Sequence, residues 1–134
     1  KISQPLLERI DICTEVPAIQ FPEMKKKKGG ESSSAIRRRV ERTQEIQRER
    51  YKNEEFSFNG ELDGRRVEKY CEMTAEAEML LEQAYTQFQF STRAYHKILK
   101  VARTVADMEG TEKIQSEHIC EALTYRAYDK KYWS

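Results

Sequence analysis

The sequence predicts a mainly α-helical fold, a small helical bundle that is preceded by one β-strand and a flexible linker. The three prolines all lie within the first 22 residues, so the rest of the chain is free to be helical. Beyond them, apolar residues recur every three or four positions, which is typical of amphipathic helices. Charged residues make up 35% and hydrophobic residues 38% of the 134 residues, which favours a small core under a charged surface.

The first elements are expected in residues 5–16, "PLLERIDICTEV". "PLLER" suits a short helical turn because proline is favoured at the first helical position. "IDICTEV" then alternates, with Ile10, Ile12 and Val16 on one side, and this predicts a strand with one buried face. The later sequence offers no convincing second strand, so we expect the edge of a sheet whose other strands lie outside this chain.

A linker and a basic helix follow this strand. Residues 25–34, "KKKKGGESSS", have nothing to bury, and one of the serines can cap the next helix. The helix expected over residues 34–52 has a thin apolar stripe, which needs a partner surface to be stable. This stripe consists of Ile36, Val40, Thr43, Ile46 or Gln47, and Tyr51. Residues 25–52 hold 11 Lys and Arg against 4 Glu, which hints at an anionic partner or simply indicates a solvated helix.

Two further helices are expected after a loop at residues 53–64, which Phe56 or Phe58 should pin to the core. A short helix, "RRVEKYCEM", ends before Thr74, a residue that suits an N-cap. The helix over 75–88 is amphipathic, and two glutamates in its first turn suit the positive end of the helix dipole. Its apolar positions are Ala77, Leu80, Leu81, Ala84, Tyr85 and Phe88.

The last two helices complete the bundle. Ser91 or Thr92 caps the helix over residues 91–110, and Gly110 ends it, as glycine commonly does. Its expected apolar face is Ala94, Tyr95, Ile98, Val101, Ala102, Val105 and Met108. A final helix starts at Ser116 and runs through "EHICEALTYRAYD", and an aromatic tail closes the chain.

The helix over 91–110 also carries a basic row, with Arg93, His96, Lys97, Lys100 and Arg103 at helical spacing. Arg93 stands in the first turn, where a helix N-terminus favours anions and an arginine fork can bind two phosphate oxygens. The basic row can simply be solvated by water, or it can bind nucleic acid or the phosphates of a nucleotide. We name Lys97, Lys100 and Arg103 as possible phosphate or DNA contacts.

Other classes of site find little support. The three cysteines are scattered and no histidine stands at ligand spacing from them, which indicates free thiols in a reducing compartment and no metal site. No window approaches the ~18 apolar residues of a membrane span, and no signal peptide is visible, so we expect a cytoplasmic protein with no membrane partner. The chain begins with Lys1 rather than Met, and we expect a piece of a longer protein.

Three stretches, in order, resemble magnesium-chelatase-like AAA+ proteins. "KISQPLLERIDICTEVP" is similar to the end of their ATPase core, where the pattern is close to ISGPLLDRIDIHVEVP. "GESSSAIRRRVERTQEIQRERY" resembles the helix that follows, and "STRAYHKILKVARTVADMEGTEKIQSEHICEALTYR" resembles the C-terminal lid domain. The ComM branch of the family is the best match. The departures are Gln4 for Gly, Glu8 for Asp and a lysine-rich linker.

The resemblance implies the end of an AAA+ core in residues 1–24, a linker in 25–33 and an AAA+ lid in 34–134. It implies a bacterial, ring-forming ATPase, expected to be hexameric, that uses ATP and Mg and pairs this chain with the rest of the core and with neighbouring subunits. Arg9 would then resemble an arginine finger that acts in trans, and Arg93 the lid arginine called sensor two. The chain alone lacks the Walker motifs, so we expect it neither to bind these cofactors tightly nor to hydrolyse ATP.

Three functions stay open. The ComM branch implies a helicase that drives DNA branch migration, for which Arg37 and Arg38 are further possible DNA contacts. The chain can instead belong to the motor subunit of a chelatase that inserts Mg²⁺ into a porphyrin. A different class is a stand-alone helical module that binds nucleic acid through its basic helices, with a salt-dependent affinity.

Overall fold

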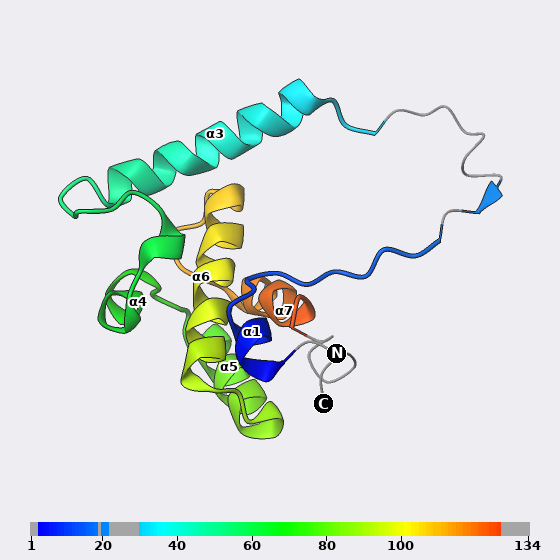
Figure 1. Cartoon of the computed structure of the whole chain (residues 1–134). Coiled ribbons are helices and arrows are strands. Elements are labelled where there is room, and N and C mark those ends of the chain that lie inside the picture. The colour runs from blue at the N-terminus through cyan, green and yellow to red at the C-terminus, as the bar shows by residue number, and fades with distance from the viewer. Residues whose placement is uncertain (1–2, 19, 22–29, 127–134) are drawn as a thin grey trace.

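Helix α6 (Thr92–Glu109) lies at the centre of the computed structural model, and the other elements pack around it (Figure 1). The structure describes residues 3–18, 20–21 and 30–126. Helix α6 contacts α1 (Gln4–Glu8), α3 (Ser33–Arg50), the 3₁₀ turn η1 (Asn59–Glu61), α4 (Gly64–Tyr70) and α7 (Ser116–Thr124), while α5 (Ala75–Phe88) packs on α7. This is the predicted small helical bundle. In the described part of the chain, no helix has the length and apolar character needed to cross a membrane.

The ends of the central helices follow the predicted capping residues. The side chain of Thr74 accepts a hydrogen bond from the Ala77 amide at 3.2 Å, which satisfies a free N–H at the start of α5. Ser91 does the same for α6, with the Ala94 amide at 3.1 Å. Gly110 ends α6 at φ +73°, a left-handed conformation that other residues adopt only with strain.

The core lies where α7 packs between α5 and α6 and where α4 packs on α6. Its fully buried side chains include Leu81, Ile98, Ala102, Ile114 and Ile119. Removing such apolar surface from water is the main force that holds the helices together.

The loop between α3 and η1 is pinned by one of its two phenylalanines. Phe56 packs against the core, with its ring centroid 4.9 Å from that of Tyr51. Phe58 lies further out, where its ring sits under the Arg48 guanidinium at 5.5 Å. Of the two alternatives left open by the sequence, the structure therefore selects Phe56.

A short backbone link ties the α4–α5 connection to the α6–α7 connection. The Thr74 amide donates to the Ile114 carbonyl and the Ile114 amide donates to the Glu72 carbonyl, both at 2.9 Å. This link explains why α4 ends at Tyr70 and not at the predicted Met73, since the chain must straighten to reach it.

The strand expected over residues 10–16 is not formed. These residues run as extended chain, and no described segment pairs with them as a strand (Figure 1). The predicted buried face forms only in part, because Ile10 is half-buried whereas Ile12 is 50% and Val16 is 85% exposed. An alternating pattern makes a strand only where a neighbouring strand supplies hydrogen bonds.

Helix α3 is anchored at one end only. Thr43, Gln47 and Tyr51 are buried, whereas Ile36 and Val40 of the same stripe remain 43% and 47% exposed. Figure 1 shows the N-terminal half of α3 extending beyond the bundle. The predicted stripe therefore finds a partner surface along its C-terminal half alone.

Other predictions meet the limits of the described residues or need correction. Most of the linker predicted at 25–33 and the aromatic tail lie outside the described residues. The last helix ends at Thr124, earlier than predicted. Met108, expected on the apolar face of α6, is 58% exposed.

Candidate anion-binding site

An open pocket of about 340 Å³ lies where the first half of α6 faces the start of α4. Its lining residues are Leu62, Asp63, Gly64, Thr92, Arg93, His96, Lys97 and Lys100. The structure thus brings four residues of the predicted basic row into one pocket, since positions three or four apart share one face of a helix.

Close packing between α4 and α6 shapes one wall of this pocket. Gly64 is the first residue of α4, and the His96 ring lies directly against it. A Cβ atom at this position would stand 2.9 Å from Cε1 of His96, closer than such atoms approach. The lack of a side chain at position 64 therefore leaves room for the His96 ring, a role that the sequence pattern did not reveal.

The pocket carries more positive than negative charge. Burial lowers the pKa of Lys100 from its ordinary value, and the nearby Lys97 ammonium lowers it further. The Arg66 amide donates to Asp63 at 2.9 Å, which lowers the pKa of that carboxyl. An anion entering the pocket would relieve the repulsion between the two lysines.

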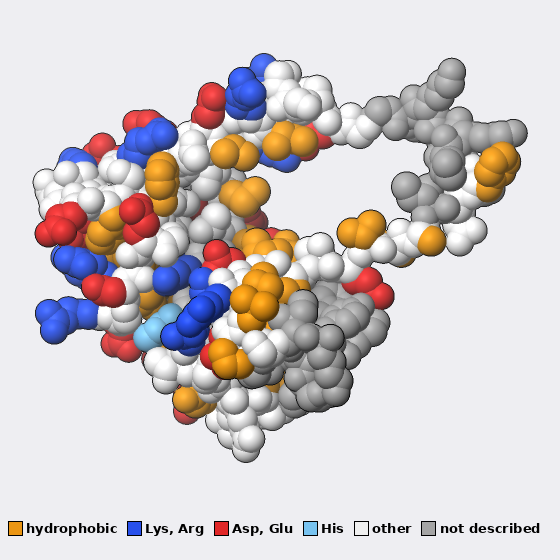
Figure 2. All heavy atoms as spheres, viewed as in Figure 1, with side chains coloured by type: hydrophobic (Ala, Val, Ile, Leu, Met, Phe, Trp, Pro, Cys, Tyr) orange, Lys and Arg blue, Asp and Glu red, His pale blue; other side chains and the backbone are white. Residues whose placement is uncertain are grey.

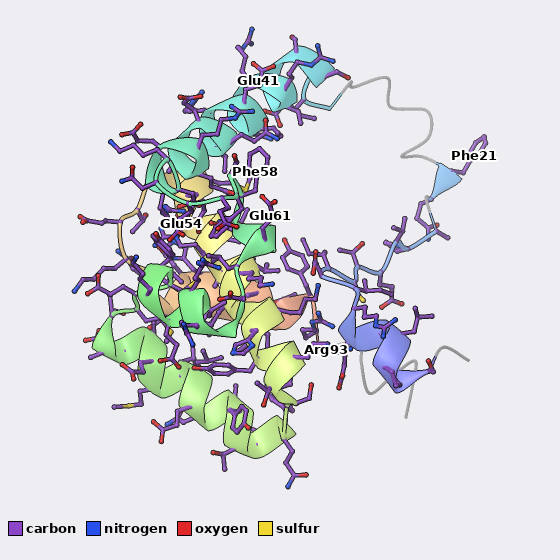
Figure 3. All side chains as sticks on the ribbon, turned by 60° about the vertical axis from the view of Figure 1, so that its left-hand side comes forward. Phe21, Glu41, Glu54, Phe58, Glu61 and Arg93 are labelled. Atoms are coloured by element: carbon purple, nitrogen blue, oxygen red, sulfur yellow. The ribbon has the colours of Figure 1, made fainter. Side chains whose placement is uncertain are left out.

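The cations of the pocket differ in how they are engaged. Lys97 forms an ion pair with Asp11, and Lys100 donates to the Gly60 carbonyl at 3.3 Å. Arg93 is exposed and has no ion-pair partner among the described residues. Figure 3 shows it on the side of α6 that faces α1. Its guanidinium is thus available to an anion.

Arg103 does not belong to this site, and its predicted role as a surface phosphate contact is wrong. The residue is only 2% exposed. Its guanidinium donates to Asp107 at 3.1 Å and to the carbonyls of Thr111 and Glu112 at 2.7 Å each. These hydrogen bonds engage the N–H donors of the guanidinium inside the fold. Asp107, four residues further along the same helix face, was the signal for such a pairing.

Asp107 is the centre of a buried polar network that the sequence pattern did not reveal. Its carboxylate also accepts from the Arg50 guanidinium of α3, with one bond of 2.9 Å, and from the side-chain amide (Nδ2) of Asn59 in η1 at 2.9 Å. Burial by itself lowers the pKa of Arg50. The hydrogen bond to Asp107 and the negative charge of that carboxylate together raise it by more, so the pKa of Arg50 lies above its ordinary value. The network fastens α3 and η1 to α6.

Arg9 and the two arginines of α3 lie outside the pocket. Arg9 is exposed and caps the C-terminus of α1, which lies against α6. Arg37 and Arg38 are exposed on α3, along which basic and acidic side chains alternate in Figure 2. Their contact with DNA stays a prediction.

His118, Glu109 and Glu117 form a compact group, with one ligand atom of each within 4.8 Å of the others. The Gln115 amide donates to Nδ1 of His118 at 2.9 Å, so the imidazole proton is on Nε2. Nε2 in turn donates to Glu109 at 2.5 Å. The Nδ1 bond thus caps the start of α7 and the Nε2 bond joins α7 to the end of α6, so the hydrogen bonds of the ring explain the group without a metal.

Comparison with known proteins gives consistent matches. The family described as "Magnesium chelatase, subunit ChlI C-terminal" matches residues 30–126. The competence protein ComM of Haemophilus influenzae is 37% identical over 128 residues, which is 95% of this chain and 24% of that protein. The uncharacterized protein YifB of Salmonella typhimurium is 36% identical over 134 residues, 97% of this chain and 25% of its own length. The chain spans about a quarter of these relatives.

Proposed function

The chain belongs to the magnesium chelatase family, and we propose that it is the C-terminal lid of a ring-forming AAA+ ATPase that couples ATP hydrolysis to DNA remodelling. The observation that carries the proposal is the basic pocket, in which Arg93, Lys97 and Lys100 face one space. Guanidinium and ammonium groups are the usual protein partners of phosphate oxygens. The pocket therefore fits the phosphates of ATP.

In this proposal, the residues of the chain stabilise charge rather than react. Negative charge builds on phosphoryl oxygens during transfer, and a fixed guanidinium neutralises it at little reorganisation cost. Arg93 would do so for the nucleotide of its own subunit, and the exposed Arg9 for that of a neighbour. Among the described residues that line the pocket, Asp63 alone carries a carboxylate, and it is engaged by Arg66, while Asp11 nearby is paired with Lys97. In this proposal, residues outside this chain would bind Mg²⁺.

The DNA part of the proposal rests on two supports. One is the similarity to a competence protein over 95% of this chain. The other is the exposed basic residues on α3, Arg37 and Arg38, which suit a polyanion. Branch migration of DNA is the remodelling activity that we assign.

A second candidate is the motor subunit of a magnesium chelatase, which inserts Mg²⁺ into a porphyrin. The description of the matched family, which names such a subunit, favours it. The pocket serves this function equally well, because both machines hydrolyse ATP. The two differ in which substrate stimulates hydrolysis.

The test is ATP hydrolysis by the full-length protein that contains this chain, with and without branched DNA. We expect Arg93→Ala to lower kcat/KM by about 100-fold, the usual effect of removing a group that stabilises transition-state charge. Arg65→Ala removes an exposed arginine of α4 outside the pocket and should leave hydrolysis unchanged.

The outcomes separate the candidates. Stimulation by branched DNA supports the first function, whereas stimulation only by a porphyrin with its chelatase partners supports the second. Normal hydrolysis by Arg93→Ala would contradict the assignment of the pocket to ATP. DNA binding by this chain alone, with a steep salt dependence and no ATPase activity in the full-length protein, would favour the stand-alone module.

A further inference from the structure

The two residues that directly follow α7 form hydrogen bonds to the segment that carries Arg9. Arg126 donates from Nη1 to the Leu7 carbonyl at 3.1 Å and from Nη2 to the Ile10 carbonyl. One residue earlier, the Tyr125 carbonyl accepts from the Cys13 amide at 3.2 Å. Three hydrogen bonds therefore connect residues separated by more than 110 positions, and two of them flank Arg9.

These bonds are well placed to fix the backbone around Arg9. The last carbonyls of a helix lack partners within the helix, and a cation near them is favourable. Arg126 is only 4% exposed, and the Leu7 side chain is fully buried, so water competes little for the two carbonyls. Arg9 itself stays exposed on the held turn. Its backbone is thus restrained while its side chain points outward.

We infer that Arg126 is a positioning residue for Arg9, which it aims at the nucleotide bound by a neighbouring subunit. This inference rests on the proposed function, in which Arg9 acts in trans. A planar guanidinium can donate to two carbonyls at once, whereas a lysine ammonium lacks this fixed fork. The choice of arginine at position 126 follows from this geometry.

An ion pair to the same segment is less able to fix its backbone than the bonds of Arg126 are. Lys97 pairs with Asp11, but the Asp11 side chain is 61% exposed. Exposed ion pairs contribute little and are screened by salt. We therefore assign the positioning of Arg9 to Arg126 and not to Lys97.

The experiment measures steady-state ATP hydrolysis by the full-length protein with Arg126→Met, Arg126→Lys or Arg9→Ala. Methionine keeps much of the buried volume and removes both donors. A misplacement of about 1 Å can cost about 100-fold in rate, so we expect Arg126→Met to lower kcat by about 10- to 100-fold. The KM for ATP should change by less than about twofold, because the subunit's own pocket is intact. Arg126→Lys should retain an intermediate rate, and Arg65→Met is the matched control.

A mixing test separates positioning from loss of structure. Each variant is mixed with subunits that keep Arg9 but lack the lysine of the ATP phosphate loop. If Arg126 acts through Arg9, the mixture regains activity for Arg126→Met as it does for Arg9→Ala, because the added subunits supply an aimed Arg9. Rescue of both variants supports the inference.

Each other outcome overturns the inference, and they can be told apart. Rescue of Arg9→Ala alone, with Arg126→Met inactive in every mixture, means that Arg126 only stabilises the lid. Wild-type activity of Arg126→Met beside an inactive Arg9→Ala removes the inference and leaves the proposed function standing. Wild-type activity of Arg9→Ala contradicts the proposed trans role of Arg9 and the inference with it.

Discussion

Replacing Asp107 by asparagine should strongly destabilise the chain, because its carboxylate neutralises two arginines inside the fold. The Asp107 side chain is 1% exposed, Arg103 is 2% exposed and Arg50 is 18% exposed. Asparagine has nearly the same shape, but it is neutral and points N–H groups at other donors. The substitution thus leaves buried positive charge without its partner.

The size of the effect follows from this burial. Breaking a buried ion pair by removing one member costs about 3 to 5 kcal/mol. Arg103 keeps its two bonds to the Thr111 and Glu112 carbonyls, so we expect the lower end of this range. A loss of about 3 kcal/mol in the free energy of unfolding corresponds to a fall of about 10 °C in Tm for a domain of this size.

Urea denaturation followed by circular dichroism measures this loss, since urea is uncharged and does not screen the network. The matched control is Glu45→Gln, which breaks an exposed pair with Arg48 and should cost less than about 0.5 kcal/mol. Adding Arg103→Met to Asp107→Asn should recover part of the stability, because it removes the unpaired charge. A cost below about 1 kcal/mol for Asp107→Asn would refute this account of the network.

Three further outcomes test other parts of the structure. Gly64→Ala should shift the NMR signals of the His96 ring while changing the free energy of unfolding by less than about 1 kcal/mol. Gly60→Ala is the control and should leave these signals unchanged. Unchanged signals in Gly64→Ala would contradict the predicted clash. His118→Ala should cost about 2 to 3 kcal/mol in urea denaturation, because the Gln115 amide and the Glu109 carboxylate lose the ring nitrogens to which they are bonded. A cost near zero would show that the ring does not join the helices. Burial raises the pKa of the Cys71 thiol from 9.0 to about 11. The stabilisation that comes from keeping this thiol protonated in the folded chain is therefore complete below about pH 9 and is lost as the pH rises toward 11. Cys71→Ala should therefore lose less stability over this interval, and an equal loss would contradict the assignment.

The helices and their caps were predictable because the responsible interactions are local. Thr74, Ser91 and Gly110 act on residues within a single turn, and the apolar repeat defines which face is buried. The strand at residues 10–16 was not correctly predicted, because a strand depends on a partner that the sequence pattern cannot supply. Local signals were thus sufficient to predict the helical bundle, whereas the conformation of residues 10–16 depends on long-range pairing.

The candidate site was predictable in part for the same reason. Helical spacing placed Arg93, Lys97 and Lys100 on one face, and the structure gathers them in a pocket. The same spacing misplaced Arg103, since its orientation depends on Asp107 and on two carbonyls beyond the helix. The spacing of cations alone cannot tell a surface row from a row whose last member turns inward.

The one-sided anchoring of α3 gives this helix two different local stabilities. Its C-terminal turns are held by Arg50, Gln47 and Tyr51, so their amide protons should exchange only when the whole domain opens. Its first turns have little packing, and a helix end of this length is marginal in water, so their amides should exchange quickly. Any surface that covers Ile36 and Val40 would slow that exchange. The free end of α3 is therefore a built-in reporter of docking, readable by hydrogen exchange without any added label.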